Sequence, residues 1–187
     1  MRKITIMEHI SLDGVIEHDE DYVYGAWTTS YRSPAGFEAV LKAYGANFDL
    51  LLGRHTYDTW AKYWPKVENN PMADNLNAAT KYVVTHTPGT LEWGPVKDLG
   101  TDMIKGIQDL KTTDGPDLIV AGSTSLTSLL FEQGLVDEVV LITYPVLLGQ
   151  GKRLFSDSVD ARKLEFVSTK PTPTGILINT YRYVGLL

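Results

Sequence analysis

Short apolar runs alternate with segments of helical spacing along the first 134 residues of the chain. The apolar runs are rich in leucine and β-branched side chains, which favour buried strands. They predict strands over residues 3–10, 48–52, 81–85 and 117–121. Apolar residues three and four positions apart predict helices over residues 34–44, 54–64, 71–79, 102–110 and 122–133. Strands that alternate with helices are typical of a mostly parallel sheet.

The pattern changes after residue 134, where β runs follow one another over residues 136–146, 164–170 and 176–183. The Pro/Gly-containing segment 171–175 predicts the turn of an antiparallel hairpin. We therefore expect an α/β fold with a mostly parallel central sheet, helices on both faces and antiparallel strands at one edge. No Pro/Gly/Ser-rich linker divides the chain, so residues 1–187 are expected to form one domain.

The strand predicted over 139–146 is apolar at nearly every position. Such a run indicates either burial on both faces of the sheet or a seam between two copies of the chain. A homodimer that uses the C-terminal strands is the expectation that follows.

Composition excludes several classes of function. The chain has no cysteine, which removes disulfides, thiolate zinc sites and cysteine nucleophiles. A formal net charge of -6 argues against a general nucleic-acid-binding surface. No histidine pair has metal-ligand spacing, and no segment has the pattern of a secretory signal or a membrane span. We expect a cytoplasmic protein with a small-molecule partner, and no metal, membrane or nucleic acid.

The carboxyl ends of the predicted strands carry the candidate chemistry, because ligands of such sheets bind there. The first is segment 53–56, Gly-Arg-His-Thr, at the start of a predicted helix. The positive charge of Arg54 is not stabilised by its own helix, whose dipole is also positive at this end. A bound anion would be attracted by both. Segments 85–87 and 122–125 add hydroxyl groups, His86 and a glycine. Each segment also has an ordinary explanation, as a helix entry, a polar turn or a capped helix, and spacing alone does not decide.

Two further segments are candidates without an assigned role. Residues 17–33 form a long polar and aromatic stretch, and connections of that length are often functional. The segment 145–155 combines an apolar strand end with two glycines and two cations. It lies either beside a pocket or at a dimer contact.

Taken together, these motifs resemble the dihydrofolate reductase superfamily. The nearest branch is the C-terminal reductase domain of the bifunctional riboflavin-biosynthesis deaminase/reductase and its stand-alone relatives. The matching pieces occur in order along the chain: SLDGVI at 11–16, LLGRHTY at 51–57, KYVVT at 81–85, VAGS at 120–123, LVDE at 135–138 and PVLLGQGKRLF at 145–155.

The resemblance implies a sheet of about eight strands and NADPH as the hydride source. By position it assigns the residues that would contact the cofactor: His9, Ile16, Gly53, Arg54, Thr56, Thr85, His86, Gly122, Ser123, Thr124 and Ser125. Arg54 would lie near the adenosine 2′-phosphate. His9, through its backbone, and Ile16 would lie beside the nicotinamide. The substrate would be lined by Trp27, Phe37 and Tyr57.

The chain departs from dihydrofolate reductases at the first helix. Those enzymes carry a substrate-binding carboxylate just after a Pro-Ala pair, whereas here Gly36 and Phe37 follow Pro34 and Ala35. True dihydrofolate reductase activity is therefore not expected. The acidic residues nearest the expected cleft, Asp13 and Glu8, are the catalytic candidates.

The sequence favours an NADPH-dependent reductase that acts on a small pyrimidine- or pterin-like heterocycle. By resemblance this is the 5-amino-6-(5-phosphoribosylamino)uracil reductase type. A non-catalytic NADPH-binding or regulatory protein on the same fold is the alternative.

Overall fold

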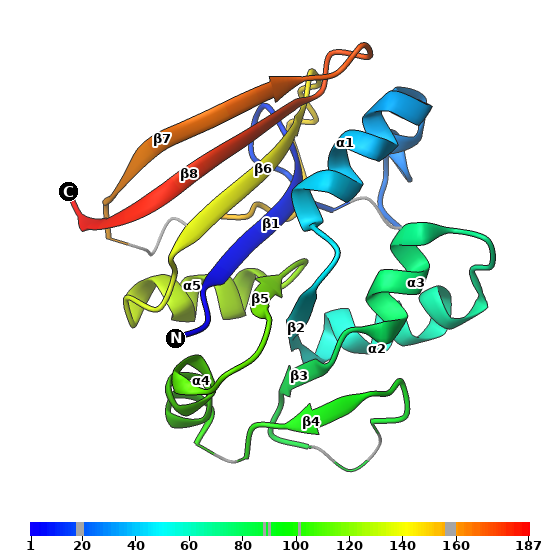
Figure 1. The fold of residues 1–187 in the computed structure, drawn as a ribbon. Coiled ribbons are helices and arrows are strands. Elements are labelled where there is room, and N and C mark those ends of the chain that lie inside the picture. The colour runs from blue at the N-terminus through cyan, green and yellow to red at the C-terminus, as the bar shows by residue number, and fades with distance from the viewer. Residues whose placement is uncertain (18–20, 88, 90, 101, 156–159) are drawn as a thin grey trace.

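The computed structural model describes residues 1–17, 21–87, 89, 91–100, 102–155 and 160–187. Its centre is an eight-stranded sheet in the spatial order β4-β3-β2-β5-β1-β6-β8-β7 (Figure 1). The strands are β1 (Ile4–Ser11), β2 (Phe48–Gly53), β3 (Lys81–Val84), β4 (Val96–Asp98), β5 (Asp117–Val120), β6 (Glu138–Tyr144), β7 (Arg162–Pro171) and β8 (Leu177–Leu186). The six strands from β4 to β6 are parallel, and β8 and β7 close one edge in antiparallel pairing.

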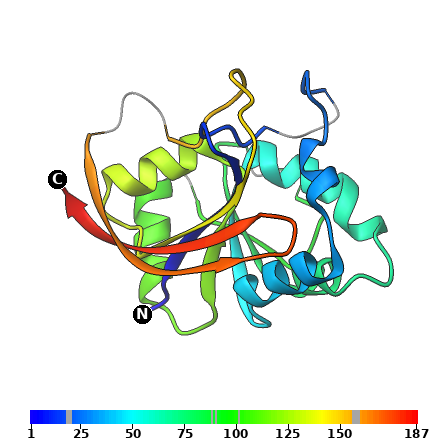
Figure 2. The same cartoon turned by 90° about the horizontal axis from the view of Figure 1, so that it is seen from above.

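Helices cover both faces of the sheet (Figure 2). They are α1 (Pro34–Tyr44), α2 (Arg54–Tyr63), α3 (Pro71–Ala78), α4 (Met103–Thr112) and α5 (Thr124–Glu132), with short 3-10 turns η1 (Trp27–Tyr31) and η2 (Trp64–Lys66). One buried cluster joins the sheet to α1, α2 and α3, and a second joins it to α4 and α5. No helix in the described part of the chain is long and apolar enough to cross a membrane.

The expected α/β fold is confirmed, including the parallel sheet and the antiparallel C-terminal hairpin. The sequence pattern did not predict strand β4 or the turn η1. Strand β4 has only three residues at the sheet edge, and none of them is buried. The turn η1 lies inside the stretch that was expected to be a loop.

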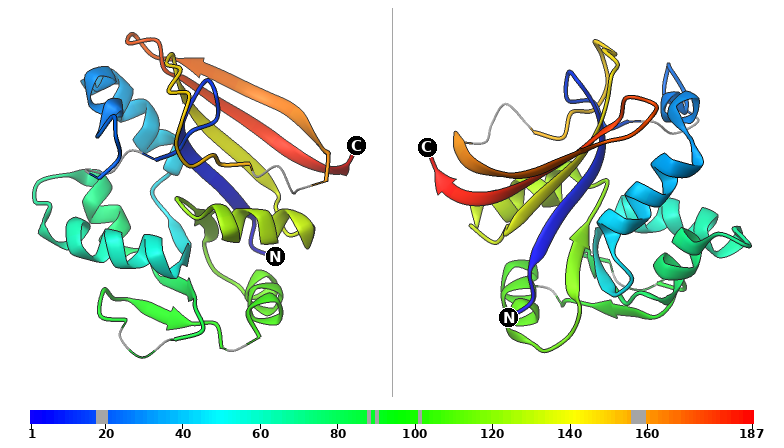
Figure 3. Two further views of the ribbon diagram at one scale, coloured as in Figure 1. Left: turned by 180° about the vertical axis from the view of Figure 1, so that it is seen from behind. Right: turned by 45° about the horizontal axis from the view of Figure 1, so that its top comes forward.

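The apolar run at 138–144 is explained by its place in the sheet. Strand β6 lies between β1 and β8 and pairs with both, and four of its seven residues are buried without a second copy of the chain. The β7–β8 hairpin forms the edge beyond it (Figure 3). The homodimer stays a prediction.

A buried ion pair joins the N-terminus to the amino ends of the sheet strands. The guanidinium of Arg2 bonds to the carboxylate of Asp49, and both side chains are less than one-tenth exposed. Asp49 also accepts a bond from the backbone N–H of Thr80 at 3.0 Å. The Arg2 guanidinium lies 5.2 Å from the ring of Tyr82. These bonds tie together segments that are distant in the sequence.

We expect Asp49→Ala to lower the free energy of unfolding by about 3 kcal/mol, because it leaves the Arg2 guanidinium buried without its counter-charge. Urea unfolding followed by circular dichroism measures this loss. Asp109→Ala, which breaks the exposed Lys105–Asp109 pair, is the matched control and should leave the midpoint unchanged. Equal shifts for the two variants would contradict the structural role of Asp49.

Candidate functional site

Two strand-to-helix turns meet at the carboxyl ends of β2 and β5. Each strand runs into a helix, β2 into α2 and β5 into α5. A Cβ atom on Gly53 would lie 2.5 Å from Ser123 Oγ, and one on Gly122 would lie 3.0 Å from the Thr56 side chain. Gly122 also has φ +70°, which favours glycine. The two turns are therefore packed directly against each other, and both helices begin at the same place.

This junction forms one side of an open groove of about 490 Å³. The groove is lined by residues from the two helix starts, the end of β3, and neighbouring side chains: Gly53, Arg54, His55, Thr56, Val84, Thr85, His86, Thr87, Met103, Gly122, Ser123, Ser125, Leu126, Leu129 and Lys152. Neither α2 nor α5 has a side-chain N-cap bond. The first-turn N–H groups and the positive dipole ends of both helices are thus suited to bind an anion.

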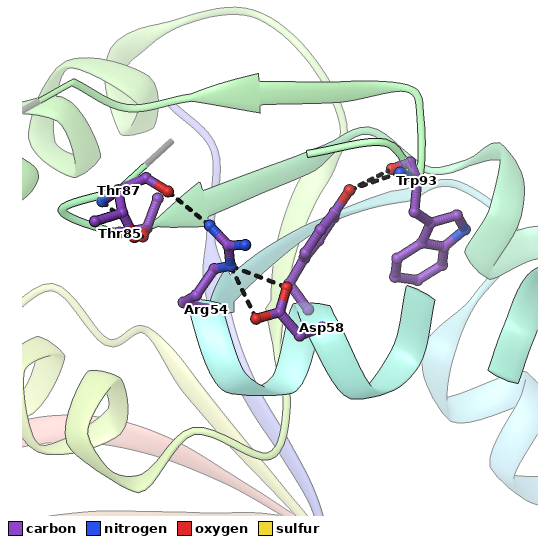
Figure 4. A network of polar contacts seen from close by, with 6 residues as sticks. Arg54, Asp58, Thr85, Thr87 and Trp93 are labelled. Carbon is purple, nitrogen blue, oxygen red and sulfur yellow. Dashed lines mark hydrogen bonds and ion pairs between the residues drawn. The ribbon is translucent and has the colours of Figure 1, made fainter. Parts of the chain in front are cut away.

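Arg54 lines the groove and is held by polar contacts with α2 and with the turn after β3 (Figure 4). Its Nε lies 2.9 Å from both carboxylate oxygens of Asp58, and its Nη1 donates to the carbonyl of Thr87 at 2.6 Å. The turn itself is held by a bond from the N–H of Thr87 to the hydroxyl of Thr85 at 3.1 Å. The guanidinium therefore links α2 to the turn after β3 and adds positive charge to the groove.

Most of the residues predicted to contact a cofactor are brought together in this groove. They are Gly53, Arg54, Thr56, Thr85, His86, Gly122, Ser123 and Ser125. Thr124 begins α5 but is not among the lining residues, and His9 and Ile16 lie outside the groove. Lys152 lines the groove although the sequence left its segment undecided. The only sequence signal for the position of Lys152 at the groove was the presence of two cations in the glycine-containing segment 145–155.

Glu8 lies beneath the Gly122 turn. Its carboxyl group accepts a hydrogen bond from the backbone N–H of Gly122, and the residue is 5% exposed. Burial raises the pKa of Glu8 to about 8, opposed by the Gly122 bond and the positive charge of Lys152. Glu8 therefore supports the turn from inside the protein.

Asp13 ties two loops together. Its carboxylate accepts bonds from the Ser11 hydroxyl at 2.6 Å and from the N–H groups of Leu148 and Gly149 at 3.1 and 2.7 Å. These bonds, with the Ser11 hydroxyl contributing most, lower the pKa of Asp13 to about 2. A carboxylate that is ionised at neutral pH and bound to loop backbone is a poor proton donor. This geometry argues against the predicted catalytic role of Asp13.

The predicted substrate-binding residues are separated in the structure. Trp27 is 9% exposed and packs edge-on against Tyr144, with the ring centroids 5.1 Å apart. Phe37 is 41% exposed on α1. Tyr57 lies in the core at 2% exposure, and its hydroxyl accepts a bond from the N–H of Trp93 at 2.7 Å. Assigning Tyr57 to a substrate surface was therefore wrong: its helical face points inward, where the hydroxyl satisfies a buried backbone group.

Glu8→Gln should make stability less dependent on pH. The pKa of Glu8 is raised on folding, so the folded state binds the proton more tightly than the unfolded state does. Its contribution is favourable below the unfolded pKa of about 4.3 and is lost as pH rises toward about 8. The glutamine keeps an oxygen for the Gly122 N–H. We expect the variant to gain stability relative to the parent chain between about pH 5 and about pH 8, measured by urea unfolding. A constant difference across that range would contradict the burial of Glu8.

Comparisons with known proteins agree with this fold. The family model of the RibD C-terminal domain matches residues 2–178. The YyaP protein of Bacillus subtilis (strain 168), which is uncharacterised, is 29% identical over 188 residues, covering 98% of this chain and 96% of YyaP. The structure of a putative riboflavin biosynthesis protein from Shewanella sp. PV-4 matches with a TM-score of 0.72 at 22% identity, covering 97% of this chain and 99% of that one. Dihydrofolate reductase from Enterococcus faecalis, in a complex with NADP(H), matches with a TM-score of 0.61 at 16% identity, covering 97% and 94% of the two chains. The fold is thus dihydrofolate reductase-like, and the chain belongs to the RibD C-terminal domain family.

Proposed function

We propose that this chain is an NADPH-dependent reductase that transfers hydride to a small heterocyclic substrate. The observation that carries the proposal is the convergence of the α2 and α5 N-termini on one groove, with Arg54 among its lining residues. Two helix dipoles and a guanidinium favour a ligand with several separated phosphate charges. NADPH has a diphosphate and a 2′-phosphate on its adenosine half.

The residues of the groove fit that cofactor. The glycines at 53 and 122 let the two turns pack closely, so the first-turn N–H groups of α2 and α5 would both be near a bound diphosphate. Thr56, Ser123 and Ser125 would add hydroxyl donors. Arg54 would hold the 2′-phosphate, and the turn at 85–86 would lie by the adenosine.

We propose that the nicotinamide half lies beside the carboxyl end of β1. Strand β5 pairs with β1 only from Ile4 to Ile6, whereas β6 continues the pairing to Ser11. Beyond Ile6 the chain of β5 turns away into Gly122 and α5. The end of β1 that β5 leaves unpaired is joined to the Gly122 turn through Glu8, which supports a place for the ring beside the backbone of His9 and near Ile16. When bound, the reduced nicotinamide supplies the hydride.

The acceptor is proposed to be a pyrimidine- or pterin-like ring of the riboflavin-biosynthesis reductase type. Membership of the RibD C-terminal domain family supports this class. The half-buried ring of Tyr31, which lies beside Tyr144 near the carboxyl end of β6, would supply a flat apolar wall for such a ring.

A non-catalytic NADPH-binding protein is the second candidate, and one observation favours it. The first turn of α1 has no acidic residue, and Glu38 further along the helix is exposed. The carboxylate that dihydrofolate reductases place there is absent, which also argues against true dihydrofolate reductase activity. Following NADPH absorbance with pterins, pyrimidines and quinoid compounds separates the two candidates, since turnover of any of them excludes the non-catalytic one.

Arg54→Ala should weaken NADPH binding by about 10- to 100-fold while changing NADH binding much less, because it removes a charge-assisted bond to the 2′-phosphate. Isothermal titration calorimetry with each cofactor measures the two affinities. Lys62→Ala removes a cation from the last turn of the same helix and should leave both affinities unchanged.

An unchanged NADPH-to-NADH ratio in Arg54→Ala would show that the guanidinium does not select the 2′-phosphate. Failure of the parent chain to bind NADPH at millimolar concentration would reject the cofactor itself.

A further inference from the structure

A hydrogen-bonded His–Tyr pair lies at the carboxyl ends of β1 and β6. His9 Nδ1 is 2.7 Å from the hydroxyl of Tyr144, and the two rings are 5.7 Å apart. Side chains alternate along β1: Met7 belongs to the cluster under α1–α3, whereas Glu8 points to Gly122. The side chain of His9 therefore points to the same face of the sheet as Met7. Its bond to Tyr144 agrees with this, because Tyr144 belongs to the same buried cluster as Met7.

Aromatic side chains enclose the tyrosine of this pair. The rings of Trp27 and Tyr31, both on η1, meet Tyr144 edge-on at 5.1 and 5.5 Å. Trp27 is fixed by a bond from its indole N–H to the carbonyl of Glu17 at 2.8 Å. Tyr144 is 4% exposed, whereas His9 is half-buried. Tyr144 thus orients the pair, and His9 is the member that a ligand contacts.

The pair also lies next to the proposed cofactor site. Glu8, the residue before His9, bonds to the Gly122 turn, and Lys152 at the groove accepts a bond from the N–H of Ile16 at 2.9 Å. A dinucleotide whose diphosphate lies at Gly122 would extend its second half along β1 to His9. An acceptor stacked on the nicotinamide would contact the His9 imidazole, on the face of the sheet to which the side chains of His9 and Tyr144 both point.

We infer that His9 is the proton donor of this reductase and that Tyr144 is its positioning residue; the inference rests on the proposed function. The acceptor is a ring with a C=N bond. Its carbon gains the hydride of the reduced cofactor, and its nitrogen gains a proton from His9 Nε2 as the C=N π bond breaks. The dihydronicotinamide is oxidised by two electrons, the acceptor is reduced by two, and the neutral imidazole regains a proton from water.

Tyr144 suits this role because it stays neutral. Burial raises the pKa of Tyr144 to about 12, with the charge of Arg32 opposing the shift. A neutral phenol accepts the Nδ1–H bond of the imidazolium and of the imidazole that has lost its Nε2 proton, so the pair persists in both protonation states. His9, on β1, thereby takes the place of the acid that is missing from the first turn of α1.

Two matched acceptors test the inference. Dihydroisoquinoline is a bicyclic imine whose reduction needs both hydride and proton. Its N-methyl iminium salt needs hydride alone. Turnover of each with NADPH is measured across a range of pH for the full chain and for His9→Asn, Tyr144→Phe and Tyr181→Phe. Asparagine keeps a polar atom near the position of Nδ1 but has no acidic proton to give.

We expect His9→Asn to lower kcat for the imine by about 100-fold or more and kcat for the iminium by less than about 3-fold. Tyr144→Phe should give a smaller loss with the same imine selectivity and a displaced pH profile. Tyr181→Phe removes a phenol hydroxyl from β8, where the ring packs against Phe166, and should match the parent chain.

Equal losses for the two acceptors, or no loss in His9→Asn, would overturn the inference. If calorimetry shows that NADPH binds but the parent chain reduces neither acceptor, the inference is also overturned while the cofactor assignment stands. Absence of NADPH binding would instead reject the proposed function.

Discussion

The contact between the two glycine turns determines where chemistry can occur in this protein. Gly53 and Gly122 lie at the carboxyl ends of adjacent parallel strands, and a Cβ atom on either would lie only 2.5 to 3.0 Å from a side chain of the other turn. Because the turns touch, the N-termini of α2 and α5 converge at one groove, and the first N–H groups of a helix have no partner within the helix itself. The remaining features of the site, Arg54 and Lys152, line the same groove.

Strand β1 connects that groove to the opposite face of the sheet. Glu8 supports the Gly122 turn from below, and the next side chain, His9, emerges among aromatic residues on the other face. Because successive side chains of a strand point to opposite faces, Glu8 lies at the proposed cofactor site and His9 at the proposed acceptor site. Asp13, a little further along, fixes the loops that border both.

Sequence periodicity predicted the sheet and helices well because the strands and helices that form the core carry buried apolar residues in a regular pattern. It missed β4, whose three residues have no buried pattern. The groove residues were predictable because glycine, hydroxyl and cation follow each strand directly. The roles of Glu8, Asp13 and Tyr57 were not, since each depends on a backbone partner far away in the sequence or in another loop. The His9–Tyr144 pair likewise requires the register of two strands that are 135 residues apart.

A crystal structure of the chain soaked with NADPH tests the central claim most directly. We expect the diphosphate to lie against the first turns of α2 and α5 between Thr56 and Ser123, the 2′-phosphate to contact Arg54, and the nicotinamide to lie beside His9. A diphosphate bound elsewhere, or a cofactor whose adenosine points away from Arg54, would contradict the account.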